Sequence, residues 1–239
     1  MLYFDNIFVI GDVHGHLDVI PDFIKEHELD NCAVIVAGDF GVGFEPQKKE
    51  LRRLKYLNDR LKTTKSVVYV VRGNHDDPAY FTGKFDTEFV KLVPDYTVLE
   101  LNLMDILCVG GATSIDRKNR KKYLTGKGND WWIDEVFVYD KDKVDQLGNV
   151  DIVVTHTAPH FAFPFTKGNL DYWINLDIHL NTDVAVERHN VTMLYQHLVQ
   201  KGNRIAKWYY GHFHMKNTLP YENTTFVALN INQIEVVKF

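Results

Sequence analysis

The chain has 239 residues, a hydrophobic fraction of 45%, a charged fraction of 25% and a formal net charge of −5. This composition is typical of a soluble globular protein, and the acidic net charge argues against a general nucleic-acid coat protein. Because no apolar run approaches 18 residues and no signal-peptide pattern opens the chain, we expect a cytoplasmic protein without membrane association. We find no repeat or linker, so we expect a single domain over residues 1–239.

The first part of the chain predicts alternating strands and helices. Apolar runs at 7–10, 32–37 and 66–71 are rich in β-branched residues and indicate buried strands. Apolar residues at helical spacing predict helices between them, around 17–24 and 51–61. This alternation implies parallel strands joined by right-handed crossovers. In such sheets, ligands bind at the carboxyl ends of the strands.

The remainder of the chain has a less regular pattern. Further strands are expected at 97–103, 106–109, 151–155 and 205–210, with a helix around 193–198. This arrangement adds a second set of strands to the first.

Three segments of this second part have no strong helical period. The polar segment 111–149 predicts a loop or cap insertion. The segment 159–183, rich in aromatic and polar residues, predicts a long loop over a site. The tail 224–239 alternates enough to predict a terminal β-hairpin.

Side chains of the metal-ligand type follow the predicted strands. Asp12 and His14 lie two residues apart, which places both on one face of an extended chain. His212 and His214 repeat that spacing. His156 has no such neighbour, and an isolated histidine is more often a hydrogen-bonded core residue than a metal ligand. The full set consists of Asp12, His14, Asp39, Asn74, His156, His212 and His214. Seven ligands are too many for one ion but suit two ions that share a carboxylate.

The donor chemistry limits which ions are expected. Oxygen ligands mixed with imidazoles suit Mn, Fe, Zn or Ni better than Mg or Ca. Cys32 and Cys108 each lie inside an apolar run, so we expect buried free thiols and no structural zinc site. We therefore expect two divalent metal ions, with manganese the ion expected in vitro.

Five motifs occur in a characteristic order: GDVHG at 11–15, GDFG at 38–41, GNHD at 73–76, TH at 155–156 and GHFH at 211–214. This set closely resembles the calcineurin-like metallophosphoesterase superfamily, from residue 11 to residue 214. The resemblance implies an α/β fold, a four-layer αββα sandwich in which two mixed β-sheets are flanked by helices. It also implies a metal site at the carboxyl ends of the strands.

The resemblance further implies a role for each site residue. One metal would be held by Asp12, His14 and His214, the other by Asn74, His156 and His212, and Asp39 would bridge them. His75 would be the catalytic histidine near the leaving group, and Asp76 would orient it. The implied activity is hydrolysis of phosphate esters by a metal-bound hydroxide in a dinuclear centre.

One departure from the family pattern concerns substrate binding. Members that act as Ser/Thr protein phosphatases carry an Asp-Arg pair in the second motif, whereas Asp39 is followed here by Phe40. The segment GGATSIDR at 110–117 resembles one found in uncharacterised microbial members instead. We hypothesise that Arg117, Arg120 and Trp132 form the substrate-side wall, because an arginine fork can hold two phosphate oxygens. The alternative is that the basic segment containing Arg117 and Arg120 is a solvated loop. Arg72 is then the next candidate for the residue that binds the phosphate.

The function expected from the sequence is therefore hydrolysis of a small or nucleotide-like phosphate ester, either a monoester or a diester. The alternatives are a nuclease of the same superfamily and a non-catalytic scaffold with the same fold. Stable nucleic-acid binding is not expected from the acidic net charge, and the oligomeric state is left open.

Overall fold

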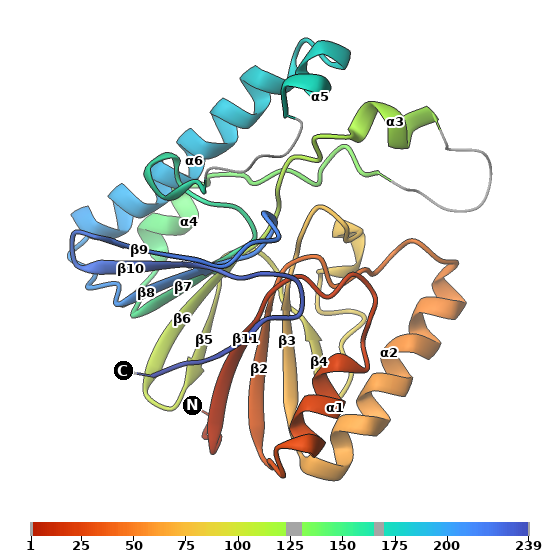
Figure 1. Ribbon diagram of the computed structural model, residues 1–239. Helices are drawn as coiled ribbons and strands as arrows, with labels where there is room; N and C mark the ends of the chain where they lie inside the picture. The colour runs from red at the N-terminus through yellow and green to blue at the C-terminus, as the bar shows by residue number, and fades with distance from the viewer. Residues whose placement is uncertain (1, 123–130, 165–169, 239) are drawn as a thin grey trace.

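The computed structural model describes residues 2–122, 131–164 and 170–238, and it contains two mixed β-sheets packed face to face (Figure 1). The strands of the first sheet, in spatial order, are β11 (Ile234–Val236), β1 (Asn6–Ile10), β2 (Cys32–Ala37), β3 (Val67–Val71) and β4 (Val90–Leu92). Those of the second are β5 (Thr97–Leu101), β6 (Met104–Val109), β7 (Ile152–Thr155), β8 (Lys207–Tyr210), β10 (Thr224–Ala228) and β9 (Asn217–Tyr221).

Helices cover the outer face of each sheet (Figure 1). The first sheet is covered by α1 (Val19–Glu26) and α2 (Gln47–Leu61), and the second by α4 (Lys141–Gln146) and α6 (Leu180–Gln200). The remaining helices are α3 (Arg117–Lys122), α5 (Leu170–Leu176) and three short 3₁₀ turns at Lys62–Thr64, Pro78–Tyr80 and His160–Ala162. Among the described residues, no helix has the length and hydropathy needed to cross a bilayer.

Three hydrophobic clusters separate the four layers. One lies between α1, α2 and the first sheet, the second lies between the two sheets, and the third lies between the second sheet and α6. Alternate residues of one strand therefore enter different clusters: Val34 packs under the helices, whereas Ile35 packs between the sheets. The fold class expected from the sequence, an αββα sandwich, is confirmed.

The parallel core of each sheet sets the position of the site. Strands β1, β2 and β3 run parallel in the first sheet, and β6, β7 and β8 run parallel in the second. All six residues of β2 are buried, as expected for a strand covered on both faces. The carboxyl ends of these strands come together at one edge of the sandwich, where the loops after them meet (Figure 1).

The expected terminal hairpin is wrong in its pairing. The hairpin of the second sheet is formed by β9 and β10, whereas β11 crosses to the first sheet and pairs antiparallel with β1. Without β11 the hydrogen-bonding groups of β1 would be left at an open edge. The alternating pattern of the tail fits either pairing, so the sequence does not distinguish them.

The two aperiodic segments contain more helix than the sequence indicates. Within 159–183 the structure has a 3₁₀ turn, α5 and the first residues of α6, while 165–169 lie outside the described residues. Within 111–149 it has α3 and α4, while 123–130 lie outside the described residues. The cysteines are free and buried, as expected.

Candidate metal centre and adjoining cavity

The seven expected ligand residues lie together at the carboxyl edge of the two sheets. The loops after β1, β2 and β3 carry four of them, and the loops after β7 and β8 carry the other three, so that both sheets contribute. Their atoms form two groups, which share the carboxylate of Asp39.

The first group consists of Asp12, His14, Asp39 and His214, whose ligand atoms all lie within 4.8 Å of one another. The Nε2 atoms of His14 and His214 are 3.0 Å apart, and Nε2 of His214 lies 3.1 Å from Oδ2 of Asp12. A proton on Nε2 of His214 can form a hydrogen bond to His14 or to Asp12, but not to both. One metal cation could instead bind all four side chains at once.

The second group is arranged around the side-chain oxygen of Asn74. This Oδ1 atom lies 3.1 Å from Nε2 of His156 and 2.9 Å from Nδ1 of His212. His156 is fully buried, and its Nδ1–H donates to the carbonyl of Ala37 at 2.7 Å. That hydrogen bond orients the ring so that Nε2 faces the centre, an arrangement common for metal-bound histidines.

Asp39 connects the two groups. Its Oδ1 lies 3.1 Å from Nε2 of His156, and its Oδ2 lies 3.9 Å from Nδ1 of His14. The two carboxylate oxygens therefore face different groups, as a carboxylate that bridges two cations would.

The backbone around the site adopts an uncommon conformation. His14, Asp39, His212 and His214 all have positive φ angles, between 48° and 68°. This region is unfavourable for residues with a Cβ atom, and its use at functional sites reflects support from the surrounding structure. Gly38, with φ of 92°, is required for a different reason: a Cβ atom there would overlap the ring of His156.

Burial and charge set the protonation of these groups. Burial lowers the pKa of both His14 and His212 below the usual range, which favours the neutral imidazole that binds metals. Burial also opposes charge on Asp39 and His156, but their mutual attraction dominates, raising the pKa of His156 to about 10 and lowering that of Asp39.

Asp76 does not orient His75 in the way the resemblance implies. Its carboxylate accepts hydrogen bonds from four backbone N–H groups, those of Phe40, Gly41, Val42 and Gly73, at 2.7 to 3.1 Å. These donors fill the carboxylate, so Asp76 ties the loop after β2 to the loop after β3. The His75 ring instead accepts a hydrogen bond at Nε2 from Nη2 of Arg120, and the same Nε2 lies 4.0 Å from Oδ2 of Asp39.

The three residues proposed for the substrate wall have different surroundings. Arg120 lines the cavity beside the centre, and its Nη1 has no hydrogen-bond partner in the described part of the chain. Arg117 instead forms ion pairs with Asp177 and Asp183, and Trp132 is buried against Phe44. Neither Arg117 nor Trp132 lines that cavity.

Arg72, the reserve candidate, is also engaged elsewhere. It is buried, it donates to the carbonyls of Asp134, Glu135 and Val136, and it pairs with Asp95 at 2.9 Å. These contacts fix the loop that carries Glu135, so Arg72 has a structural role here.

Two residues near the centre were missed by sequence reasoning. Ser114 accepts a hydrogen bond from Nδ2 of Asn74 at 3.0 Å, and it donates through Oγ to Glu135 at 2.8 Å. The backbone N–H of Ser114 donates to the other oxygen of Glu135 at 2.7 Å. Because Nδ2 is occupied in this way, Oδ1 of Asn74 is the atom that faces the histidines. Ser114 lies within the segment 110–117 that resembles microbial members, but that resemblance implied no role for it, and Glu135 belongs to no motif.

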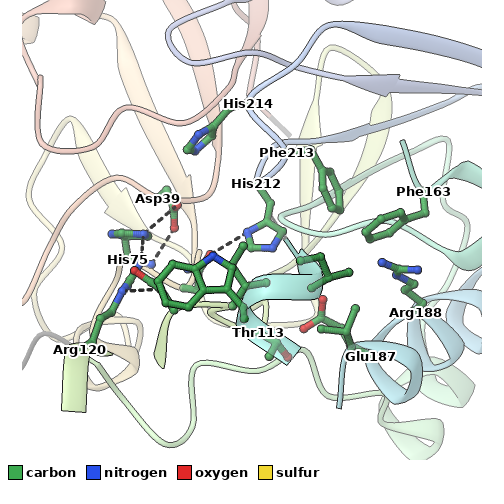
Figure 2. Close-up of a pocket in the computed structure, with 16 residues that line it drawn as sticks. Asp39, His75, Thr113, Arg120, Phe163, Glu187, Arg188, His212, Phe213 and His214 are labelled. Atoms are coloured by element: carbon green, nitrogen blue, oxygen red, sulfur yellow. Dashed lines mark hydrogen bonds and ion pairs between the residues drawn. The ribbon is translucent and has the colours of Figure 1, made fainter. Parts of the chain in front are cut away.

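A cavity of about 350 Å³ begins at the centre and extends between the second sheet, α3, α5 and α6. Figure 2 shows Asp39, His75 and Arg120 at one end and Phe163 with Arg188 at the other. Its volume is near the lower end of the range of small-molecule sites, about 300–1,000 Å³. The site therefore combines a cluster of metal-ligand side chains with a pocket of small-molecule size.

Comparisons with known proteins agree with this architecture. A family model described as calcineurin-like phosphoesterase matches residues 6–216. The crystal structure of TT1561 from Thermus thermophilus is 13% identical, with a TM-score of 0.54 over 97% of this chain and 98% of its own. A second solved structure is 14% identical, with a TM-score of 0.53 over 98% of each chain.

A protein of Streptococcus pneumoniae TIGR4, described as an uncharacterized predicted phosphoesterase, is 16% identical over 95% of this chain and 72% of its own, with a TM-score of 0.35. No curated protein matches the chain. At these identities the likeness to solved structures shows the fold alone.

Proposed function

This chain belongs to the calcineurin-like phosphoesterase family, and from that premise we propose that it hydrolyses phosphate esters of small molecules with the help of two divalent cations. The observation that carries the proposal is the position of Asp39, whose two oxygens face two separate groups of ligand side chains. The small cavity beside it supports a small-molecule substrate over a protein or a nucleic acid.

The donor atoms fit two cations. Asp12, His14 and His214 would hold one ion, and Asn74, His156 and His212 would hold the other, with Asp39 shared between them. The facing nitrogens of His14 and His214, only 3.0 Å apart, support this assignment. When bound, such a pair of ions supplies Lewis acidity and lowers the pKa of water. Nitrogen and oxygen donors without thiolates suit Mn, Fe, Zn or Ni.

Arg120 and His75 would act on the substrate from the cavity side. The free Nη1 of Arg120 can donate to a phosphoryl oxygen. Arg120 would thus take the place of the arginine that protein phosphatases carry in the second motif. Burial, aided by the neighbouring Arg120, lowers the pKa of His75 to about 4, so its ring is neutral before substrate binds. A bound phosphate would attract the Arg120 donor and, through its negative charge, favour a proton on His75.

The role of His75 is then to give that proton to the leaving oxygen. As water forms a bond to phosphorus and loses a proton to solvent, the bond from phosphorus to the leaving oxygen breaks. The leaving oxygen takes the proton from His75, which returns to the neutral form. Asp76 supports this arrangement indirectly, because it holds the loop on which His75 stands.

The test is an assay of metal-reconstituted protein against a matched chromogenic phosphomonoester and phosphodiester. We expect two ions per chain by elemental analysis and turnover of at least one ester. His75→Ala should keep both ions and lower kcat about 10²–10⁴-fold, whereas His160→Ala, which changes an exposed histidine, should match the wild type. A folded protein that binds two ions and cleaves neither ester nor any small phosphate ester would contradict the proposal.

A further inference from the structure

The two ends of the cavity are lined by side chains of different kinds. The near end carries Asp39, His75 and Arg120, whereas the far end is walled by aromatic and aliphatic side chains, including Phe163, Trp173 and Val184. Phosphoryl transfer needs only the near end. The far end must therefore face whatever group the phosphate is attached to.

Aromatic rings dominate the far wall. Phe163 and Phe213 meet edge to face with their ring centroids 4.6 Å apart. Phe213 directly follows His212, so the aromatic wall begins beside the ligand residues, as Figure 2 shows. Flat apolar surfaces of this kind favour a planar ring, because stacking adds to the gain from removing apolar surface from water.

Two polar side chains interrupt this wall at neighbouring positions of α6. Glu187 is only 4% exposed, and its Oε1 accepts a hydrogen bond from Thr157 at 2.9 Å. Burial raises the pKa of this carboxyl, and the backbone and side chain of Thr113 lie close enough to oppose that rise. No described donor meets Oε2 at hydrogen-bonding geometry, however, and Figure 2 shows the carboxylate directed from α6 towards the cavity. Leaving a buried acceptor without a well-placed donor destabilises the protein, and a donor on a ligand would relieve that cost.

Arg188 supplies the complementary group. Its guanidinium carbon lies over the Phe163 ring, 3.1 Å from the ring centroid, in a cation–π contact. Its Nε has no hydrogen-bond partner in the described part of the structure. The far end thus presents one acceptor and one donor, on neighbouring residues of α6, next to aromatic surfaces.

We propose that the far end binds a nucleobase, so that the substrate is a nucleotide whose ring lies against the aromatic wall. Glu187 would accept a hydrogen bond from a ring N–H or amino group, and Arg188 would donate to an adjacent ring nitrogen or carbonyl. This inference rests on the proposed phosphoesterase function, since the phosphate would occupy the near end. A sugar phosphate would leave the aromatic wall uncovered, and a plain aryl phosphate would leave both polar groups unpaired.

The experiment compares kcat/KM for AMP, GMP, CMP and UMP with that for ribose 5-phosphate and phenyl phosphate, on protein loaded with two ions. We expect at least one nucleotide to exceed both reference compounds about 10-fold or more, because a site built for hydrogen bonding discriminates against ligands that lack the partner groups. Glu187→Gln and Arg188→Gln should each reduce that preference about 10-fold. Glu26→Gln, on the exposed face of α1, should leave it unchanged.

Calorimetric binding of the same four nucleotides separates this inference from the function on which it depends. Turnover of ribose 5-phosphate or phenyl phosphate without any nucleotide preference would overturn the nucleobase site and leave the phosphoesterase proposal intact. If no ester is cleaved, nucleotide binding that weakens in both folded variants would still support the site, and absence of binding would overturn it. Circular dichroism checks that Glu187→Gln and Arg188→Gln are folded. If one of them fails to fold, the test uses the other.

Discussion

The two ligand groups use similar donor atoms but are connected to the rest of the protein in different ways. In the first group the side chains of His14 and His214 are 23% and 46% exposed. In the second group His156 is fully buried and Asn74 is 3% exposed.

Hydrogen bonds to non-ligand residues account for much of this difference. The second group is held by Ala37 behind His156 and by Ser114 and Glu135 behind Asn74. A ligand embedded in such a network contributes to folding as well as to metal binding. A partly exposed ligand such as His214 contributes mainly to metal binding. The following predictions test that distinction.

The largest effect is expected where the two groups meet. Asp39→Ala removes the carboxylate that faces both groups, so we expect loss of both ions and a fall in kcat/KM of at least about 10³-fold. Elemental analysis and kinetics on the folded variant measure both quantities. A variant that keeps one ion per chain at full occupancy would show that Asp39 serves one group only.

The second prediction compares one ligand from each group in metal-free protein. His156→Ala leaves the carbonyl of Ala37 without its donor and creates a cavity, so the free energy of unfolding should fall by about 2–4 kcal/mol. His214→Ala changes a side chain that is 46% exposed, and its effect should stay within about 0.5 kcal/mol. Urea denaturation measures both free energies of unfolding. Equal losses in the two variants would show that the two ligand groups do not differ in their contribution to folding.

The third prediction concerns pH. Burial raises the pKa of Glu135 from 4.5 to about 7, so between these values the folded protein holds a proton that the unfolded chain releases. Stability from this group is therefore full below pH 4.5 and is lost as pH rises to about 7. Between pH 5 and 7.5, metal-free wild type should lose about 2 kcal/mol relative to Glu135→Gln. Parallel curves for the two proteins would contradict the assignment.

The smallest effect is expected for Ser114→Ala. Without the acceptor for its Nδ2, the amide of Asn74 is free to turn and present a donor towards the cation. We expect the affinity of one ion to fall about 10-fold while the other is unchanged, as for other residues that orient ligands. Titration with Mn²⁺ resolves the two sites. Ser66→Ala is the matched control, because Ser66 is a buried, hydrogen-bonded serine that contacts Cys32 instead.

The sequence predicted those parts of the fold and the site that depend on short-range pattern. β-Branched runs located β1, β2 and β3, and the motif residues directly after them were expected at one edge because parallel strands end together. The sequence did not indicate in which direction a given side chain points. Asp76 is adjacent to His75 in sequence, yet its carboxylate turns towards the backbone of the β2 loop.

Contacts between irregular segments could not be predicted at all. Ser114 and Glu135 are 21 residues apart in segments without a period, and only the folded loop brings them together. The same limit applies to Arg117 and Arg120, which were both expected to line the substrate-side wall. Long, flexible side chains reach different partners from nearly the same position, so Arg117 pairs with Asp177 while Arg120 lies beside His75.

Because each ligand group draws residues from both sheets, a bound ion would also be a cross-link. His14 follows β1, whereas His214 follows β8, and 200 residues separate them along the chain. Closing so long a loop in an unfolded chain costs entropy that grows only as the logarithm of its length. A cation held by the folded form alone adds about 2.7 kcal/mol of stability at a free concentration 100 times its Kd. The supply of metal would thus set how firmly the two sheets are held together at this edge.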